Sequence, residues 1–113
     1  MLTIQQEKGL ASRHEKNYEL QFLQHVRDAD PNHPGYNNIV HLLDSFHYEG
    51  PHGKLLCIIT EVTGENLWKF AQRSDIHGCL PSFLVRILSR QLLLGLDYLH
   101  SCKIIHTGAC TIL

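Results

Sequence analysis

The sequence predicts an α+β fold, because helical apolar spacing dominates two long segments while runs of β-branched and aromatic residues lie between them. The 113 residues suffice for one domain and are too few for two. Apolar residues make up 43% of the chain, and no stretch approaches the ~18 consecutive apolar residues of a membrane span. A formal charge of −1 predicts neither a nucleic-acid nor an anionic-membrane partner.

The first helix is expected over residues 12–27. Residues 12–15, SRHE, have the pattern of a capping box at a helix N-terminus. The segment 28–35 contains two prolines and ends the helix. Five residues fall on one face of the predicted helix: Glu15, Glu19, Phe22, Leu23 and Val26. Glu19 is the unusual member, because it places a carboxylate on a face otherwise suited to burial.

Two β-type runs follow, over residues 39–48 and 54–62. The five residues between them, EGPHG, are typical of the connection in a β-hairpin. The second run is almost continuously apolar, so both of its faces should be covered.

Two more helices are expected in the second half of the chain. Asn66 can cap a short helix from Leu67 to Arg73, and residues 74–81 form a loop. The last helix runs from about Ser82 to Ser101, and its apolar stripe is wider than ~100°. Such a helix is normally surrounded by protein. The few other elements cannot surround it, so we expect an exposed face that a partner protein would cover.

The cysteine spacing and the N-terminal sequence predict reduced thiols in a cytoplasmic or nuclear protein. The N-terminal 16 residues contain no apolar segment of a secretory signal, and no CxxC pair occurs. Four potential zinc ligands have the spacing H-x-C-x3-H-x3-C: His100, Cys102, His106 and Cys110. This spacing matches no structural zinc pattern, and the first two residues close an apolar helix, so no metal site is predicted.

The order of these segments, together with several motifs, resembles eukaryotic protein kinases and in particular the SR-protein kinase (SRPK) branch. The motifs are HPG, LLDSF, EGPHGKLLCIITE and QLLLGLDYLH…IIHT, and the resemblance covers about residues 12–107. It implies a partial kinase fold: an αC-like helix, a two-stranded antiparallel hairpin, a hinge, a short αD-like helix and a long αE-like helix. The implied plan is an N-terminal tail (1–11), part of the N-lobe (12–62), the hinge (63–65) and the start of the C-lobe (66–113).

The resemblance also assigns a vestigial ATP site. Glu19 matches the αC glutamate that pairs with the phosphate-binding lysine, and Thr60 matches the gatekeeper behind the adenine pocket. Glu61 and Thr63 match hinge residues whose backbone C=O and N–H groups meet the adenine edge. His106 matches a scaffold histidine of the catalytic loop. On the residues alone, Glu19 would be a surface glutamate of a helix and Thr60 an ordinary strand threonine.

The catalytic groups of the family have no counterpart among the 113 residues. No GxGxxG occurs, Lys8 does not lie in an apolar V-A-I-K strand, and Gly108 occupies the position of the catalytic Asp. The Asn and Asp that hold Mg²⁺ are also missing. The expectation is therefore a fragment of a serine/threonine kinase that binds neither ATP nor Mg²⁺ and is inactive, although its family uses both and acts on protein substrates. The alternatives are a non-catalytic interaction module or pseudokinase fragment, and a small α+β domain without a ligand.

Overall fold

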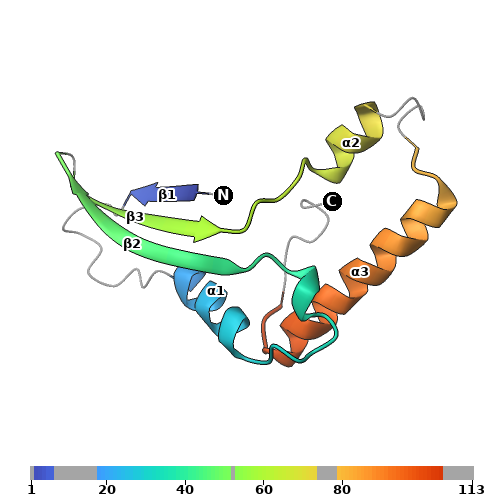
Figure 1. Cartoon of the computed structure of the whole chain (residues 1–113), viewed down its shortest axis with the longest axis horizontal. Helices are drawn as coiled ribbons and strands as arrows, with labels where there is room; N and C mark the ends of the chain where they lie inside the picture. The colour runs from blue at the N-terminus through green and yellow to red at the C-terminus, as the bar shows by residue number, and fades with distance from the viewer. Residues whose placement is uncertain (1, 7–17, 52, 74–78, 106–113) are drawn as a thin grey trace. The chain divides into compact units, whose positions relative to one another are not determined.

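The computed structural model describes residues 2–6, 18–51, 53–73 and 79–105, and the α+β class is confirmed. Figure 1 shows the helices and strands in chain order: β1 (Leu2–Gln6), α1 (Tyr18–Asp28), the 3-10 helix η1 (Tyr36–Asn38), β2 (Leu42–Gly50), β3 (Gly53–Thr60), α2 (Leu67–Arg73) and α3 (Ser82–Ser101). Among the helices of the described segments, none has both the length and the hydropathy of a membrane span.

The chain divides into two compact units, and the chain passes between them three times. The first unit comprises Met1–Pro31 and Val40–Thr63, and the second comprises Asn32–Ile39 and Gly64–Leu113. The break after Thr63 falls at the start of the predicted hinge. The short segment Asn32–Ile39 packs with the second unit, although the residues on both sides of it belong to the first. The local sequence does not predict this arrangement.

The first unit contains an antiparallel sheet with the strand order β1-β3-β2. The predicted hairpin of β2 and β3 is confirmed, and its pairing extends to Gly50 opposite Gly53, so the connection is shorter than the predicted five residues. The sheet has a third strand that the sequence does not predict, because β1 pairs along the other edge of β3. Residues 1–11 carry no strand signal that stands out, and only the long-range pairing with an apolar neighbour makes Leu2–Gln6 a strand.

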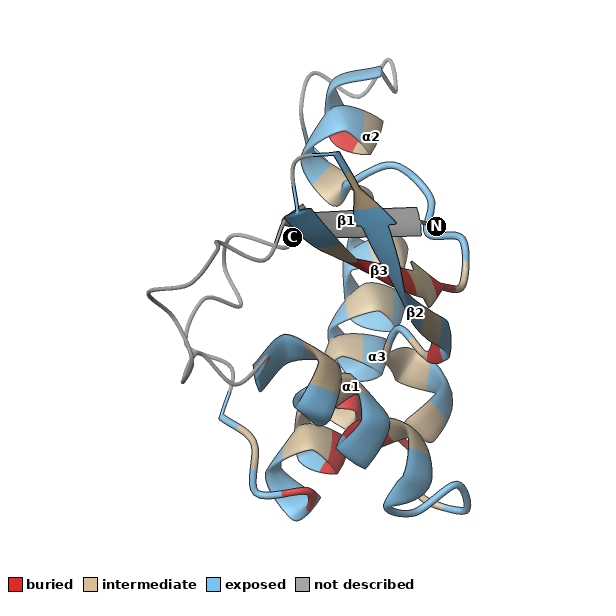
Figure 2. Cartoon of the chain, turned by 90° about the vertical axis from the view of Figure 1, so that its left-hand side faces the viewer, coloured by how far each residue is buried: buried red, intermediate tan, exposed pale blue. Residues whose placement is uncertain are grey.

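The core of the first unit lies on one face of the sheet. Leu42, Leu56 and Ile58 form a buried cluster, and Leu20 and Leu23 of α1 pack against it. Cys57 lies between two of these residues in β3 and is also buried, although its side chain points to the opposite face. Figure 2 shows buried residues on β3. The prediction that both faces of this strand are covered is therefore confirmed.

Helix α1 ends at Asp28, one residue beyond the predicted end, and the predicted capping box lies outside the described residues. The predicted burying face is only partly right. Val26 is buried and Leu23 half-buried, but Glu19 and Phe22 are exposed. The sheet contacts the side of α1 that carries Leu20, so the burying face is rotated away from Glu19.

The second unit contains α2 and α3, and both have the predicted bounds. The predicted cap of α2 is also confirmed, because the Lys69 N–H donates to Asn66 Oδ1 at 2.9 Å. Part of the predicted loop before α3, residues 74–78, lies outside the described residues.

The segment Asn32–Ile39 docks on α3 through two close backbone approaches. A Cβ on Gly35 would overlap the carbonyl oxygen of Leu94. A Cβ on Gly95 would lie 2.8 Å from the carbonyl oxygen of Asn38. Glycine at both positions therefore lets the two backbones approach more closely than any side chain would permit.

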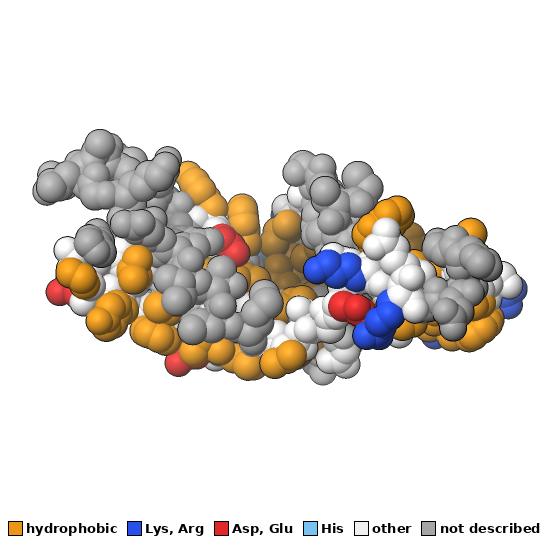
Figure 3. All heavy atoms as spheres, turned by 90° about the horizontal axis from the view of Figure 1, so that it is seen from above, with side chains coloured by type: hydrophobic (Ala, Val, Ile, Leu, Met, Phe, Trp, Pro, Cys, Tyr) orange, Lys and Arg blue, Asp and Glu red, His pale blue; other side chains and the backbone are white. Residues whose placement is uncertain are grey.

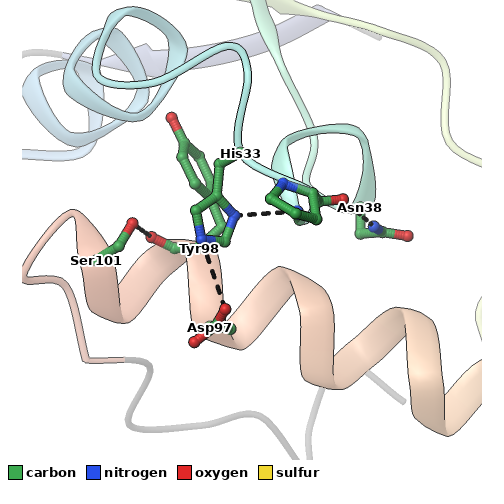
Figure 4. Close-up of polar contacts among 7 residues, drawn as sticks. His33, Asn38, Asp97, Tyr98 and Ser101 are labelled. Atoms are coloured by element: carbon green, nitrogen blue, oxygen red, sulfur yellow. Dashed lines mark hydrogen bonds and ion pairs between the residues drawn. The ribbon is translucent and has the colours of Figure 1, made fainter.

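An aromatic and polar cluster surrounds this contact (Figure 4). Tyr98 of α3 is fully buried, and the rings of His33 and Tyr36 lie 5.2 and 5.6 Å from its ring centre. His33 Nδ1 accepts from the Gly35 N–H at 3.0 Å, while its Nε2 lies 3.5 Å from Asp97 Oδ2. The cluster fixes the segment on the C-terminal half of α3.

Much of the apolar surface of α3 is exposed, as its wide stripe predicts. Phe83 is 64% exposed and Leu93 is 65% exposed, and Val85 and Ile87 are also exposed. Hydrophobic side chains are likewise prominent on the face of the molecule drawn in Figure 3. Large exposed apolar side chains are typical of surfaces that bind protein.

Candidate functional site

The four residues assigned to the ATP site lie in the first unit, three of them where β3 ends. Thr60 is the last residue of β3 and is only 6% exposed, Glu61 is half-buried, and Thr63 is exposed. Glu19 lies in the first turn of α1 and is exposed. The site residues therefore divide into a group at the end of β3 and a separate glutamate on the helix.

Thr60 lies on the face of the sheet that α1 covers. Side chains alternate along a strand, so Thr60 shares a face with Leu56 and Ile58. Leu20 and Leu23 of α1 pack against these two residues. A gatekeeper residue needs such a position, buried at the strand end beneath a helix.

Glu61 makes two hydrogen bonds to one backbone residue, His41, just before β2. The Glu61 N–H donates to the His41 carbonyl oxygen at 3.2 Å. The His41 N–H donates to Glu61 Oε1 at 2.9 Å. The backbone therefore leaves the sheet at a fixed point, and the following residue, Val62, is 88% exposed.

Residues 61–66 then form a connection without helix or strand. In such a connection, not all backbone N–H and C=O groups are hydrogen-bonded to a neighbouring strand. The remaining groups can hydrogen-bond to the polar edge of a flat heterocycle. The hydrogen bond from the His41 N–H to the Glu61 side chain was not predicted from the sequence. The only signal for this bond in the sequence is a glutamate directly after an apolar strand.

Comparison with known proteins shows which proteins this chain is similar to. SRSF protein kinase 3 of Mus musculus is 46% identical over 90 residues, which are 79% of this chain and 16% of that protein. Protein kinase dsk1 of Schizosaccharomyces pombe is 44% identical over the same shares of the two chains. Serine/threonine-protein kinase SKY1 of Saccharomyces cerevisiae is 44% identical over 93 residues, 79% of this chain and 12% of that protein.

The chain is a relative of the SRPK-family serine/threonine kinases. The resemblance in the sequence motifs is thereby confirmed. The matched segment spans about one sixth or less of the length of these three relatives. No family model matches the sequence.

In the described part of the first unit, few cationic side chains are available to bind a phosphate near the end of β3. Within the described part of the first unit, the cationic side chains are Arg27 and Lys54. Arg27 pairs with Asp28 at 2.8 Å and Lys54 with Glu49 at 3.4 Å. The hydrogen bond from Arg27 lowers the pKa of the Asp28 carboxyl below its ordinary value. Lys54 lies six residues before Thr60, roughly 20 Å along an extended strand.

The remaining predicted positions lie outside the described residues: Lys8, His106, Gly108 and Cys110. Two of these belong to the zinc-like spacing, so the structure does not test that pattern. Across the described ranges, no group of three His, Cys, Asp or Glu side chains could hold a metal ion. Cys57 and Cys102 are buried free thiols, and Cys79 is an exposed one.

Proposed function

We propose that these 113 residues form part of a serine/threonine protein kinase domain of the SRPK type and by themselves do not transfer phosphate. One observation carries the proposed inactivity. Strand β1 precedes α1 and pairs with β3, as the lysine-bearing strand does in the family, yet its sequence LTIQQ contains no lysine.

In this proposal each element has a kinase counterpart. Helix α1 corresponds to αC, β2 and β3 are the hairpin that leads into the hinge, and α2 and α3 correspond to αD and αE. Thr60 is the gatekeeper, and Glu61 and Thr63 occupy the hinge positions whose backbone groups contact adenine in the family. The buried position of Thr60 and the fixed backbone of Glu61 support these assignments. Glu19, in the first turn of α1, would be the αC glutamate.

The chemistry explains why such a site would be inactive. Phosphoryl transfer depends on positioning and on positive charge that stabilises the moving phosphoryl group. Removing one preorganised group typically lowers the rate by about 10²–10³. The printed sequence has no Gly-rich loop, no V-A-I-K strand and Gly108 in place of the catalytic Asp, so several such losses combine.

A nucleotide titration tests the proposed site. The unfolding temperature of the 113-residue chain is expected to stay constant with adenosine, with ATP, and with ATP plus Mg²⁺, because a ligand that does not bind the folded state cannot stabilise it. An SRPK-family kinase such as dsk1, measured in parallel, is the positive control. A rise in the unfolding temperature that ATP causes only with Mg²⁺, and that adenosine does not cause, would reveal phosphate binding. This result would contradict the proposal.

A non-catalytic interaction module is the second candidate function. The exposed apolar residues of α3, among them Phe83, Ile87 and Leu93, favour it. Size-exclusion chromatography separates the two candidates. A stable stoichiometric complex between the chain and a complete SRPK-family kinase would favour the module, whereas aggregation of the isolated chain would favour a kinase fragment that lacks its covering elements.

A further inference from the structure

The histidine of the cluster on α3 accepts a hydrogen bond from the backbone two residues later. The Gly35 N–H donates to His33 Nδ1 at 3.0 Å. Pro34 between them has no N–H, so the Gly35 N–H is the first that the imidazole can reach in this direction. A ring nitrogen accepts only through its lone pair. Nδ1 therefore carries no proton, and the imidazole is neutral with its proton on Nε2.

The donor of this hydrogen bond is buried. Gly35 is buried, and its backbone lies so close to α3 that a Cβ would overlap the carbonyl oxygen of Leu94. Within the described residues, His33 Nδ1 is the acceptor that the structure gives this N–H. A buried N–H that loses its acceptor destabilises the fold by more than the bond itself contributes. Docking of residues 32–39 on α3 therefore depends on an unprotonated Nδ1.

Titratable groups face His33 from both helices that pack around it. From α3, Asp97 Oδ2 lies 3.5 Å from His33 Nε2, and the Tyr98 ring centre lies 5.2 Å from the imidazole centre (Figure 4). From η1, the Tyr36 N–H donates to the His33 carbonyl oxygen at 3.0 Å. Tyrosine is neutral in the pH range in which histidine titrates, so of these three groups Asp97 supplies the charge that acts on His33.

Protonation of His33 has two opposing effects. The second proton enters at Nδ1 and sets one donor against another, which breaks the bond from the Gly35 N–H. The same proton strengthens the contact with Asp97. The Asp97 side chain is 72% exposed, however, and an ion pair in contact with water contributes little. The loss of the buried hydrogen bond therefore outweighs the gain of the surface ion pair.

We propose that His33 is a proton-sensitive latch, which holds residues 32–39 on α3 when neutral and releases them when protonated. The docked form loses a hydrogen bond when it takes up the proton, whereas the released form loses none, so the released form takes up the proton more readily. The docked form therefore loses stability as the pH falls below about 6.5, the ordinary midpoint of histidine. The latch rests on the contacts of His33 and not on the proposed function.

Hydrogen exchange of the Gly35 amide, followed by NMR on the full chain at pH 7.5 and pH 5.0, tests the latch. The protection factor, which corrects for the intrinsic pH dependence of exchange, is expected to fall about tenfold at pH 5.0, the effect of one lost hydrogen bond. His33→Asn is the decisive variant. Asn Oδ1 stands in the place of Nδ1, accepts the same N–H and does not titrate, so Gly35 should be equally protected at both pH values.

The imidazole ¹⁵N shifts of the wild-type chain test the latch even if His33→Asn folds poorly. At pH 7.5, His33 Nδ1 is expected to show the shift of an unprotonated ring nitrogen, and Nε2 that of a protonated one. His47→Asn, at an exposed histidine of β2, is the matched control and should show the wild-type loss of Gly35 protection. A proton on Nδ1 at pH 7.5, unchanged or higher wild-type protection at pH 5.0, or an equal loss in His33→Asn would overturn the proposal.

Discussion

Replacing Gly35 with alanine is expected to destabilise the second unit by about 3 kcal/mol, the upper end of the usual range for overpacking. The new Cβ would overlap the Leu94 carbonyl oxygen, and its next neighbours are the Leu94 carbonyl carbon and Tyr98 Cβ. Backbone atoms in the middle of a helix cannot move aside as a flexible side chain can. The segment Asn32–Ile39 must therefore move off α3, which uncovers the buried Tyr98 ring.

Urea unfolding of Gly35→Ala, followed by circular dichroism and by Tyr98 resonances, measures this loss. Gly64→Ala is the matched control, because a Cβ at Gly64 meets nothing within 4 Å, and it should change stability by less than about 0.5 kcal/mol. If both variants unfolded at the urea concentration of the wild-type chain, the docking of residues 32–39 on α3 would be wrong.

Replacing Leu56 with alanine is expected to destabilise the first unit by about 2–5 kcal/mol. Leu56 is fully buried in the central strand and belongs to the cluster that Leu20 and Leu23 cover. Truncation removes apolar contacts on the face where α1 meets the sheet and leaves a cavity there. The loss should therefore loosen α1 as well as β3.

Hydrogen exchange of the α1 and β3 amides, together with the unfolding midpoint, checks this expectation. Leu43→Ala is the matched control in the neighbouring strand, because Leu43 is 62% exposed, and its effect should stay within about 0.5 kcal/mol. Equal effects of the two substitutions would contradict the described core.

The elements that the sequence predicts best are those defined by local signals. The bounds of α2 and α3 follow from the Asn66 cap and from twenty residues of helical apolar spacing. The β2–β3 hairpin follows from two β-type runs joined by glycine and proline. Each of these signals lies within the element that it defines, so no tertiary contact is needed to read it.

The features that the sequence does not predict depend on distant partners. Strand β1 forms by pairing with β3, about fifty residues later in the chain. The need for Gly35 depends on Leu94, and the burying face of α1 depends on where the sheet lies. Tyr98 lies outside the predicted apolar stripe, yet its side chain is fully buried.

The candidate site shows the same division. The assignments of Thr60, Glu61 and Thr63 come from the resemblance to SRPK kinases, because backbone contacts of a hinge leave almost no side-chain pattern. The hydrogen bond between the Glu61 carboxylate and the His41 N–H is visible only in the structure. A glutamate at the end of a strand would otherwise pass for an ordinary surface charge.

Transfer of radioactive γ-phosphate tests the central claim most directly. The 113-residue chain is incubated with labelled ATP, Mg²⁺ and a serine-rich protein substrate, beside heat-treated chain and an active SRPK-family kinase. We predict label only in the sample with the active kinase, because these residues supply neither the lysine of the β1 position nor the catalytic Asp. Label incorporated by the purified chain above the heat-treated sample would contradict the account.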